Sequence, residues 1–300
     1  MARFTLLRLL SLLTLTTGPA FAQITPQAPT LKGRVLDAKT HQPIPYASLT
    51  LSNEYGWTLA NALGRFELAN PIKLASDTLL VDCPGYLPRL VVLASHRLAD
   101  SILTLESTQL VHKNAEPVGT KVSLKQLDSL AKRPGDGMIQ GSMGSQYALL
   151  MEPSHKHPPG TIRNVSFYIG EGGLPTESFR VRIYRADGPN HSPGTNLLTQ
   201  NLVVAAPGGG QWFTVDISSY FVGAPRDGFF VAMEWIVAHK RAPEGDNYLP
   251  AAQILRPTFE FRDSKTWTFT VGRGWNLLPL KNAESRAYNA MIRAEIEELE

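Results

Sequence analysis

The chain has 300 residues, of which 43% are hydrophobic and 18% charged, and it contains a single cysteine. Two of its 29 basic residues, Arg3 and Arg8, lie in the first 22 positions without an acidic neighbour, so the rest of the chain carries 27 basic against 26 acidic residues. This near-neutral balance gives no electrostatic reason to expect nucleic acid as a partner. One thiol cannot form an internal disulfide, so the stability of the fold must come from burial.

Residues 1–22 have the order of features found in a secretory signal peptide. Arg3 and Arg8 precede the apolar run Leu9–Leu15, and Ala20-Phe21-Ala22 provides a small-x-small cleavage site before Gln23. The apolar run is too short to span a bilayer, and no later run approaches that length. The residue directly after Ala22 is Gln23 and not a cysteine, so we expect no lipid anchor. We therefore predict an exported protein with no transmembrane segment in its mature chain.

Residues 31–106 form the first predicted domain. Short apolar segments alternate with turn residues in this region, a pattern typical of a β-sandwich. The expected strands are Leu31–Asp37, Ala47–Ser52, Arg65–Leu68, Asp77–Asp82, Leu90–Leu93 and Ile102–Leu105.

Five motifs in this region resemble a carboxypeptidase-regulatory-like domain. They are Gly33-Arg-Val-Leu-Asp37, Gln42-Pro-Ile-Pro-Tyr-Ala-Ser48, Gly64-Arg-Phe-Glu-Leu68, Asp77-Thr-Leu-Leu-Val81 and Pro84-Gly-Tyr86. The departures from the family pattern are mild and fall at Gln42, Asn61 and Cys83. The resemblance implies a small transthyretin-like sandwich in an envelope protein of a Gram-negative bacterium. It also implies that this domain accompanies other functional parts and performs no chemistry itself.

Residues 107–145 are predicted to be a linker that contains a short helix. In Val122–Lys132 the residues Leu124, Leu127 and Leu130 follow a threefold spacing. Ser123 can cap such a helix, and Arg133-Pro134-Gly135 would end it. The Gly- and Ser-rich segment Gly135–Ser145 is predicted to be either a loop or an entry strand of the next domain.

Residues 146–283 are expected to form a second β-sandwich of the jelly-roll type. The expected strands are Tyr147–Met151, Ile162–Ile169, Phe179–Arg185, Gln211–Ile217 and Gly228–Val237. In the third of them Phe179, Val181 and Ile183 should face inward, whereas Arg180 and Arg182 should face outward. Residues 284–300 are predicted to form a C-terminal helix. The predicted fold is therefore all-β, with two sandwich domains, a connecting helix and a C-terminal helix.

The sequence offers few residues with the spacing of a metal or nucleophilic site. His155 and His157 could share one strand face, but Pro158-Pro159-Gly160 follows and a third ligand is missing, so an exposed loop without a metal is expected. Cys83 next to Asp82 is expected to be an inert core thiol, because a neighbouring acid raises a thiol pKa. We predict no cofactor and no catalytic residue.

Two further groups of residues have alternative interpretations. Glu234 and Asp216 could form the acid pair of a glycosidase, but strand alternation makes both of them simply outward-facing or hydrogen-bonded residues. Alternating Trp267 and Phe269 suit a core face.

Arg273 and Trp275, beside Gly272 and Gly274, are the candidate ligand contacts. A guanidinium next to an indole can hold a sugar or a carboxylate, and the glycines let the backbone present both side chains.

These patterns favour a secreted, non-catalytic protein in the periplasm or on the surface of a Gram-negative bacterium. Its expected role is binding or scaffolding, with a glycan or an envelope protein as partner. One alternative is an envelope hydrolase with its site in the second β domain. Another is an accessory subunit of an outer-membrane complex that docks through the C-terminal helix.

Overall fold

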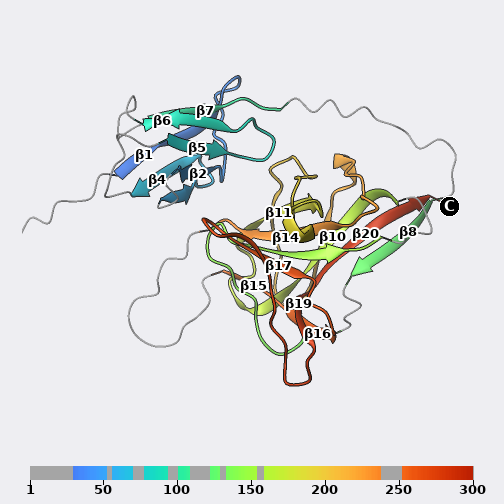
Figure 1. Cartoon of the computed structure of the whole chain (residues 1–300). Coiled ribbons are helices and arrows are strands. Elements are labelled where there is room, and N and C mark those ends of the chain that lie inside the picture. Colours follow the sequence, from blue (N-terminus) through green and yellow to red (C-terminus); the bar gives the residue numbers. More distant parts are fainter. Residues whose placement is uncertain are drawn as a thin grey trace, which may run out of the picture.

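The computed structural model describes residues 30–52, 56–69, 78–93, 101–108, 122–128, 133–153, 159–237 and 252–299 (Figure 1). These residues form β-strands, turns and short 3₁₀ turns such as η3 (Pro189–His191) and η4 (Ser218–Tyr220), which confirms the all-β prediction. In the described part of the chain, no helix has the length and apolar character needed to cross a membrane. The predicted signal segment lies outside the described residues.

Seven strands between residues 30 and 105 form two sheets, called here the N-terminal sheets. One sheet has the order β4-β1-β7 and the other the order β3-β2-β5-β6. The strands are β1 (Thr30–Asp37), β2 (Ser48–Leu51), β3 (Trp57–Leu59), β4 (Arg65–Ala69), β5 (Thr78–Asp82), β6 (Arg89–Val92) and β7 (Ser101–Leu105). One hydrophobic core joins the two sheets, with Val35 from β1, Phe66 from β4 and Leu79 from β5 among its buried members. This arrangement follows the predicted alternation most clearly in β4 and β5, where every second residue is buried.

The remaining strands form the C-terminal sheets. A five-stranded sheet has the order β13-β10-β20-β8 with β15 added to β10, a six-stranded sheet has the order β12-β11-β14-β9-β17-β18, and β16 pairs with β19. The strands up to residue 216 are β8 (Val122–Asp128), β9 (Gln146–Met151), β10 (Pro159–Gly173), β11 (Ser178–Arg185), β12 (Val203–Ala205) and β13 (Gln211–Asp216). The later strands are β14 (Phe229–Trp235), β15 (Gln253–Leu255), β16 (Pro257–Phe261), β17 (Thr266–Thr270), β18 (Gly274–Leu277), β19 (Ala287–Ala290) and β20 (Ile292–Leu299).

The main core of the C-terminal sheets lies between the five-stranded and the six-stranded sheet. Phe167 of β10 and Phe179 of β11 meet edge to face there, with ring centroids 5.2 Å apart. As predicted, Phe179, Val181 and Ile183 all face this core and are fully buried. The central strand β14 is buried along its whole length, so the six-stranded sheet is covered on both of its faces.

The prediction of a C-terminal helix was wrong, because residues 287–290 form β19 and residues 292–299 form β20. The Glu- and Ala-rich composition has helix propensity, but Ile292, Ala294 and Ile296 also alternate with charged residues. All three are buried, and β20 is hydrogen-bonded to β10 on one side and to β8 on the other. Burial of this alternating face between two partner strands overrides the local propensity.

The predicted helix over 122–132 was also wrong in its described part, since residues 122–128 form β8. The three-residue spacing that suggested a helix places Leu124 and Leu127 on opposite faces of a strand. Leu127 is buried in the main core, whereas Leu124 is 61% exposed. Strand β8 is the edge of the five-stranded sheet and pairs only with β20 among the described strands.

The Gly-rich segment Gly135–Ser145, predicted to be a loop or an entry strand, packs on the C-terminal core. Ile139 is buried and exchanges backbone hydrogen bonds with Leu255 at 2.8 and 2.9 Å. A Cβ atom on Gly141 would lie 2.3 Å from the Trp235 ring, so the backbone there requires a glycine.

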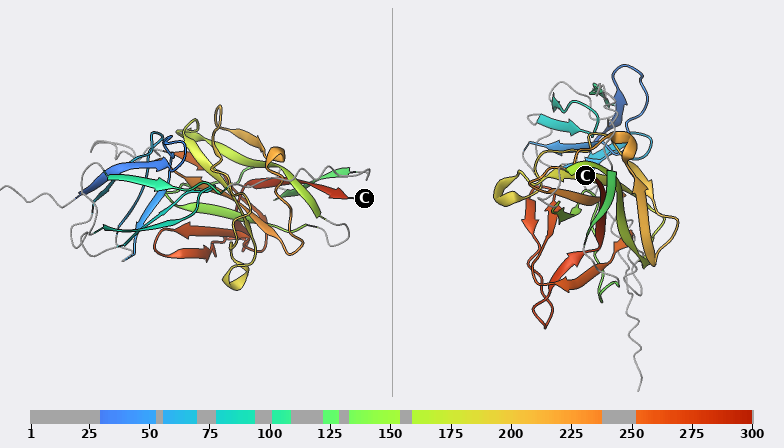
Figure 2. Two further views of the ribbon diagram at one scale, coloured as in Figure 1. Left: turned by 90° about the horizontal axis from the view of Figure 1, so that it is seen from above. Right: turned by 90° about the vertical axis from the view of Figure 1, so that its right-hand side faces the viewer.

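The N-terminal and C-terminal sheets lie side by side (Figures 1 and 2). Arg180 of β11 donates a hydrogen bond to the carbonyl oxygen of Tyr46, and Asn201 Nδ2 donates to the carbonyl oxygen of Pro45 at 2.9 Å. The ring of Trp57 lies against the backbone of Gly144, where an added Cβ would be only 2.8 Å from the ring. These contacts join parts of the chain that are more than 80 residues apart.

Replacing Ile296 by Ala should lower the free energy of unfolding by about 2–5 kcal/mol, because it empties a fully buried position in β20. Leu124→Ala on the neighbouring strand β8 is the control and should change stability by less than about 0.5 kcal/mol, because Leu124 is mainly exposed. Urea denaturation of both variants measures the difference. Equal losses for the two would contradict the strand arrangement of the C-terminal residues.

Candidate functional site

The outer face of the six-stranded sheet carries a group of polar side chains at the end that meets the N-terminal sheets. Strand alternation places Arg180 and Arg182 of β11 on this face, opposite Glu234 of β14. Arg180 pairs in register with Glu234, and Glu234 pairs with Gln146 of β9. Three adjacent strands therefore bring charged and amide groups to one spot.

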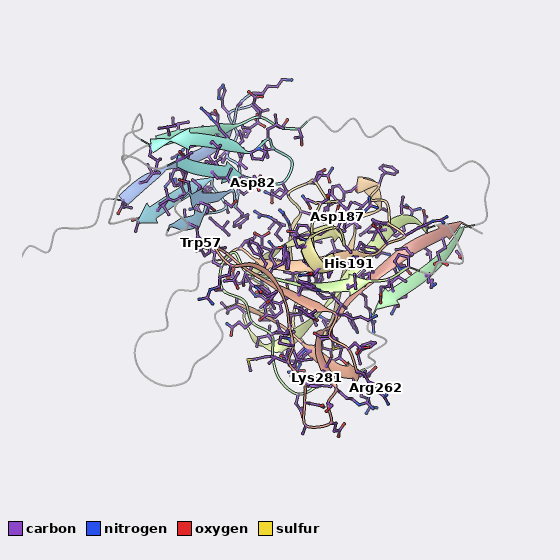
Figure 3. The ribbon with its side chains drawn as sticks, in the orientation of Figure 1. Trp57, Asp82, Asp187, His191, Arg262 and Lys281 are labelled. Carbon is purple, nitrogen blue, oxygen red and sulfur yellow. The ribbon has the colours of Figure 1, made fainter. Side chains whose placement is uncertain are left out.

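The facing surface is the outer face of the sheet β3-β2-β5-β6. Thr50 lies opposite Trp57 in the register of β2 and β3, and Ser48 lies opposite Asp82 in the register of β2 and β5. Figure 3 shows Trp57 and Asp82 on the side of the N-terminal sheets that is turned toward the C-terminal sheets. Both opposing walls of the site therefore come from regular strands.

A cavity of about 280 Å³ lies between these two faces. It is lined by Ser48, Thr50, Trp57, Leu59, Asp82, Pro84, Gly144, Gln146, Arg180, Arg182, Tyr184, Glu234, Phe269, Val271 and Trp275. Two guanidinium groups, two carboxyl groups and four aromatic rings therefore surround one space.

Arg180 is the most constrained side chain of the site, with only 2% of its surface exposed. Its Nη1 donates to Glu234 Oε1 at 2.9 Å, its Nε donates to Asn201 Oδ1 at 2.8 Å, and its Nη2 donates to the carbonyl of Tyr46. Tyr46 has a φ of 57°, which turns its carbonyl group in a left-handed backbone conformation. Arg180 therefore links both halves of the molecule and has little capacity left for a ligand.

Glu234 has one oxygen engaged and one free. Its side chain is 6% exposed, and Oε1 receives the hydrogen bond from Arg180. Among the described residues, none donates a hydrogen bond to the buried Oε2 atom. Arg182 Nε lies 4.0 Å from Oε2, which is too long for a hydrogen bond. A buried acceptor without a donor is costly, and this acceptor belongs to a side chain of the cavity lining.

The polar groups next to Glu234 are held in place by aromatic residues. Arg182 Nε donates to the Tyr184 hydroxyl at 2.8 Å, and that hydroxyl donates to Gln146 Oε1 at 2.8 Å. The Tyr184 ring meets the Trp275 ring edge to face at 5.5 Å, and Trp275 lies 5.3 Å from the Phe269 ring. Burial raises the pKa of Tyr184, so this phenol stays protonated and remains a hydrogen-bond donor.

Burial also shifts the pKa values of two titratable groups at the end of β5, Asp82 and Cys83. It raises the pKa of the Asp82 carboxyl above its ordinary value of 3.8, although the guanidinium groups of Arg182 and Arg180 oppose part of this shift. Burial raises the pKa of the Cys83 thiol to about 12, so the thiol is not a nucleophile at neutral pH.

The structure brings some of the sequence-based candidates into the site and leaves others outside. Trp275 lines the cavity, but Arg273 is exposed in the turn between β17 and β18 and is absent from the lining. Glu234 lies in the cavity wall, whereas Asp216 lines a separate hollow with Arg163 and other residues at the five-stranded sheet. The two acids that were considered as a glycosidase pair are therefore not in one site.

No group of three or more His, Cys, Asp or Glu residues is placed to hold a metal ion within the described ranges. His155 and His157, the metal candidates of the sequence, lie outside those ranges.

Sequence reasoning missed Trp57, Asp82, Arg182 and Tyr184 as members of the site. A usable signal was present in β11, where two arginines alternate with fully apolar residues in a strand next to an equally apolar β14. Alternation showed which face they occupy, but it did not show that another sheet covers this face.

Arg180→Met should reduce the free energy of unfolding by about 3–5 kcal/mol, because it leaves the buried Glu234 carboxylate without its partner. Arg185→Met, on the same strand, is the matched control. Arg185 pairs with Asp227 at 2.9 Å, but both side chains are about half exposed, so its loss should cost less than about 1 kcal/mol. Urea titrations at neutral pH compare the two, and similar small losses would refute the buried link.

Asp82→Asn should change the pH dependence of stability in a defined direction. Because the folded protein raises the pKa of Asp82, the wild type loses stability as pH rises from about 3.8 through the raised pKa. The Asn variant lacks this loss, so its stability relative to wild type should increase across that interval.

Asp216→Asn is the control with the opposite sign. The hydrogen bonds that Ser218 donates hold the pKa of Asp216 below 3.8, so the wild-type advantage should appear as pH rises and should vanish in acid. Thermal melts of the three proteins at a series of pH values test both directions. Parallel pH profiles for wild type and Asp82→Asn would contradict the burial of this carboxyl.

A comparison with models of known protein families finds no match for this chain, and a comparison with curated proteins finds no relative. The resemblance of residues 31–106 to a carboxypeptidase-regulatory-like domain therefore stays a prediction from the five motifs.

Proposed function

We propose that this chain is a non-catalytic binding protein that takes a glycan in the cavity between its N-terminal and C-terminal sheets. The observation that carries this proposal is the buried Oε2 atom of Glu234, which has no hydrogen-bond donor among the described residues and belongs to a cavity-lining side chain beside Arg182. A sugar hydroxyl both donates and accepts hydrogen bonds. It can therefore donate to the carboxylate and accept from the guanidinium at the same time.

The remaining walls suit the apolar surfaces of a sugar ring. Trp57, Phe269 and Trp275 contribute flat rings to the lining, from both halves of the molecule. Small-molecule sites combine apolar and aromatic walls with a few fixed polar groups that set orientation and specificity. The hydrogen bonds that hold Arg182, Tyr184 and Gln146 in position provide such fixed groups before any ligand arrives.

We place this function in the envelope of a Gram-negative bacterium. The signal-like residues 1–22 and the five motifs of residues 31–106 support an exported protein with a transthyretin-like first domain. The separate hydrophobic cores of residues 31–105 and 127–296 support two sandwich domains, the second of them similar to a jelly roll. In this proposal the first domain performs no chemistry and provides one wall of the binding site.

A hydrolase is the second candidate, and one observation favours it. Asp82 and Glu234 line the same cavity, and burial raises the pKa of Asp82 while Glu234 forms an ion pair with Arg180. Glycoside hydrolysis uses one protonated and one ionised carboxyl group. The accessory-subunit alternative has lost its basis, because the docking helix on which it rested is strand β20.

A glycan array followed by isothermal titration calorimetry of the best hits tests the proposal. Trp275→Ala should weaken binding by about three- to tenfold, because it removes an aromatic wall of the cavity. Trp212→Ala is the control, since Trp212 lies on β13 under the guanidinium of Arg293 and outside the cavity lining. It should leave the affinity unchanged.

Three outcomes would count against a non-catalytic glycan-binding function. Release of free sugar from the array hits during incubation would support the hydrolase. Capture of one envelope protein without any glycan binding would favour a protein partner. Equal losses of affinity for Trp275→Ala and Trp212→Ala would place the ligand elsewhere.

A further inference from the structure

We infer that the cavity recognises one uncharged sugar ring at the end of a glycan, and that this ring must contact the N-terminal and the C-terminal sheets together. This inference rests on the proposed function and specifies its ligand. It depends on the size of the cavity, on its charge balance and on the origin of its walls.

The size of the cavity limits the ligand to about one ring. Its volume of about 280 Å³ lies just below the range of roughly 300–1,000 Å³ that is usual for sites of small ligands. It lies between two sheet faces that hydrogen bonds from Arg180 and Asn201 hold together. A chain of several sugars would need a groove that continues beyond these contacts. The end of a glycan fits the space without separating the sheets.

The charges around the cavity balance without a ligand. Arg180 forms a 2.9 Å ion pair with Glu234, and the guanidinium of Arg182 acts on the Asp82 carboxyl. A charged ligand group would add an unbalanced charge to a site in which burial already shifts the pKa of a carboxyl. Burial of an unpaired charge is strongly unfavourable. Uncharged hydroxyl groups avoid this penalty. They can still donate hydrogen bonds to the carboxylates and accept them from the guanidinium groups.

Arg182 and the Oε2 atom of Glu234 lie close together without a hydrogen bond between them. Nε of Arg182 and Oε2 of Glu234 are 4.0 Å apart, so they do not satisfy each other. Tyr184 is already engaged with Arg182 and Gln146, which leaves Oε2 as the buried acceptor to be filled. Because the single Nε–H group of Arg182 is donated to the Tyr184 hydroxyl, two neighbouring hydroxyls on one ring would engage the carboxylate and the Nη groups of this guanidinium.

The N-terminal sheets contribute a carboxyl group and a ring that the C-terminal sheets do not replace. Asp82 ends β5 and Trp57 begins β3, and both line the cavity opposite Glu234 and Trp275. The Trp57 ring rests on the backbone at Gly144, so its position is set by contact with the other half. A ligand in this space therefore has groups to contact on both sides.

The test is calorimetry with defined probes on the full-length protein. The methyl glycosides of glucose, galactose and mannose are compared with methyl glucosaminide, which is cationic, and with methyl glucuronide, which is anionic. Trisaccharides that carry the preferred ring either at the end or in the middle complete the set. At least one neutral methyl glycoside should bind, the charged analogues should bind at least about tenfold more weakly, and only terminal rings should be accepted.

Variants then test the contribution of each half. Asp82→Asn and Trp57→Ala should each reduce the affinity of the best neutral glycoside by about tenfold, which corresponds to the loss of one good contact. Asp227→Asn is the control, since this carboxylate is half exposed and lies outside the cavity lining. Melting curves of each variant show that the comparison is made on folded protein.

The outcomes separate this inference from the proposed function. If no glycan binds in any format, the proposed function fails and the inference fails with it. If glycans bind but charged or internal rings are preferred, the proposed function stands and the inference is overturned. Unchanged affinity in both folded variants, Asp82→Asn and Trp57→Ala, would also overturn it, because the N-terminal sheets would then play no part in recognition.

Discussion

The buried contact between Arg180 and Glu234 is the interaction on which the arrangement of this molecule depends. Removing both charges from water is expensive, and their attraction offsets that cost only when the remaining hydrogen-bonding groups also find partners. Arg180 meets this condition with three acceptors: Glu234, the side chain of Asn201 and the backbone carbonyl of Tyr46. The last of these belongs to the N-terminal sheets. Satisfying one buried guanidinium therefore joins the two halves of the chain, and it leaves the second oxygen of Glu234 without a donor among the described residues.

The six-stranded sheet makes this contact possible because it is buried on both faces. Its inner face is apolar and packs on the main core, whereas its outer face changes character along its length. Phe230, Ala232 and Tyr184 form a smaller apolar cluster there, with Trp267 and Trp275 packed against it. The charged residues lie next to that cluster, under the N-terminal sheets. The aromatic side chains thus border the polar groups, and a mixed polar and aromatic cavity results from the order of residues along three strands.

The division of the site between two sets of strands has a consequence for recognition. Each wall is regular β-structure, and the polar groups on the wall of the six-stranded sheet are already oriented by hydrogen bonds. Binding to prearranged groups avoids part of the entropy cost of ordering side chains and loops. In the proposed function, the N-terminal sheets form one wall of the site: they supply Asp82 and Trp57 as ligand contacts, and they depend on the link to Arg180 to stay in place.

Much of the local structure could be read from the sequence. Alternation placed Phe179, Val181 and Ile183 in the core and Arg180 with Arg182 on the opposite face, and turn residues located most strands between residues 31 and 105. The helices predicted over 122–132 and 284–300 were wrong: leucine spacing suggested the first and residues 284–300 have helix propensity, but pairing of β20 with β8 and with β10 makes the described parts strands. The formation of the cavity depends even more on contacts between residues that are far apart in the chain. Periodicity tells which side of a strand a residue occupies, but whether that side meets water or another sheet depends on a segment 134 residues away in the case of Arg180 and Tyr46. The sequence by itself therefore determined the faces of the strands, and only the tertiary structure decided that the charged face would be buried, because burial is a property of what packs against a strand.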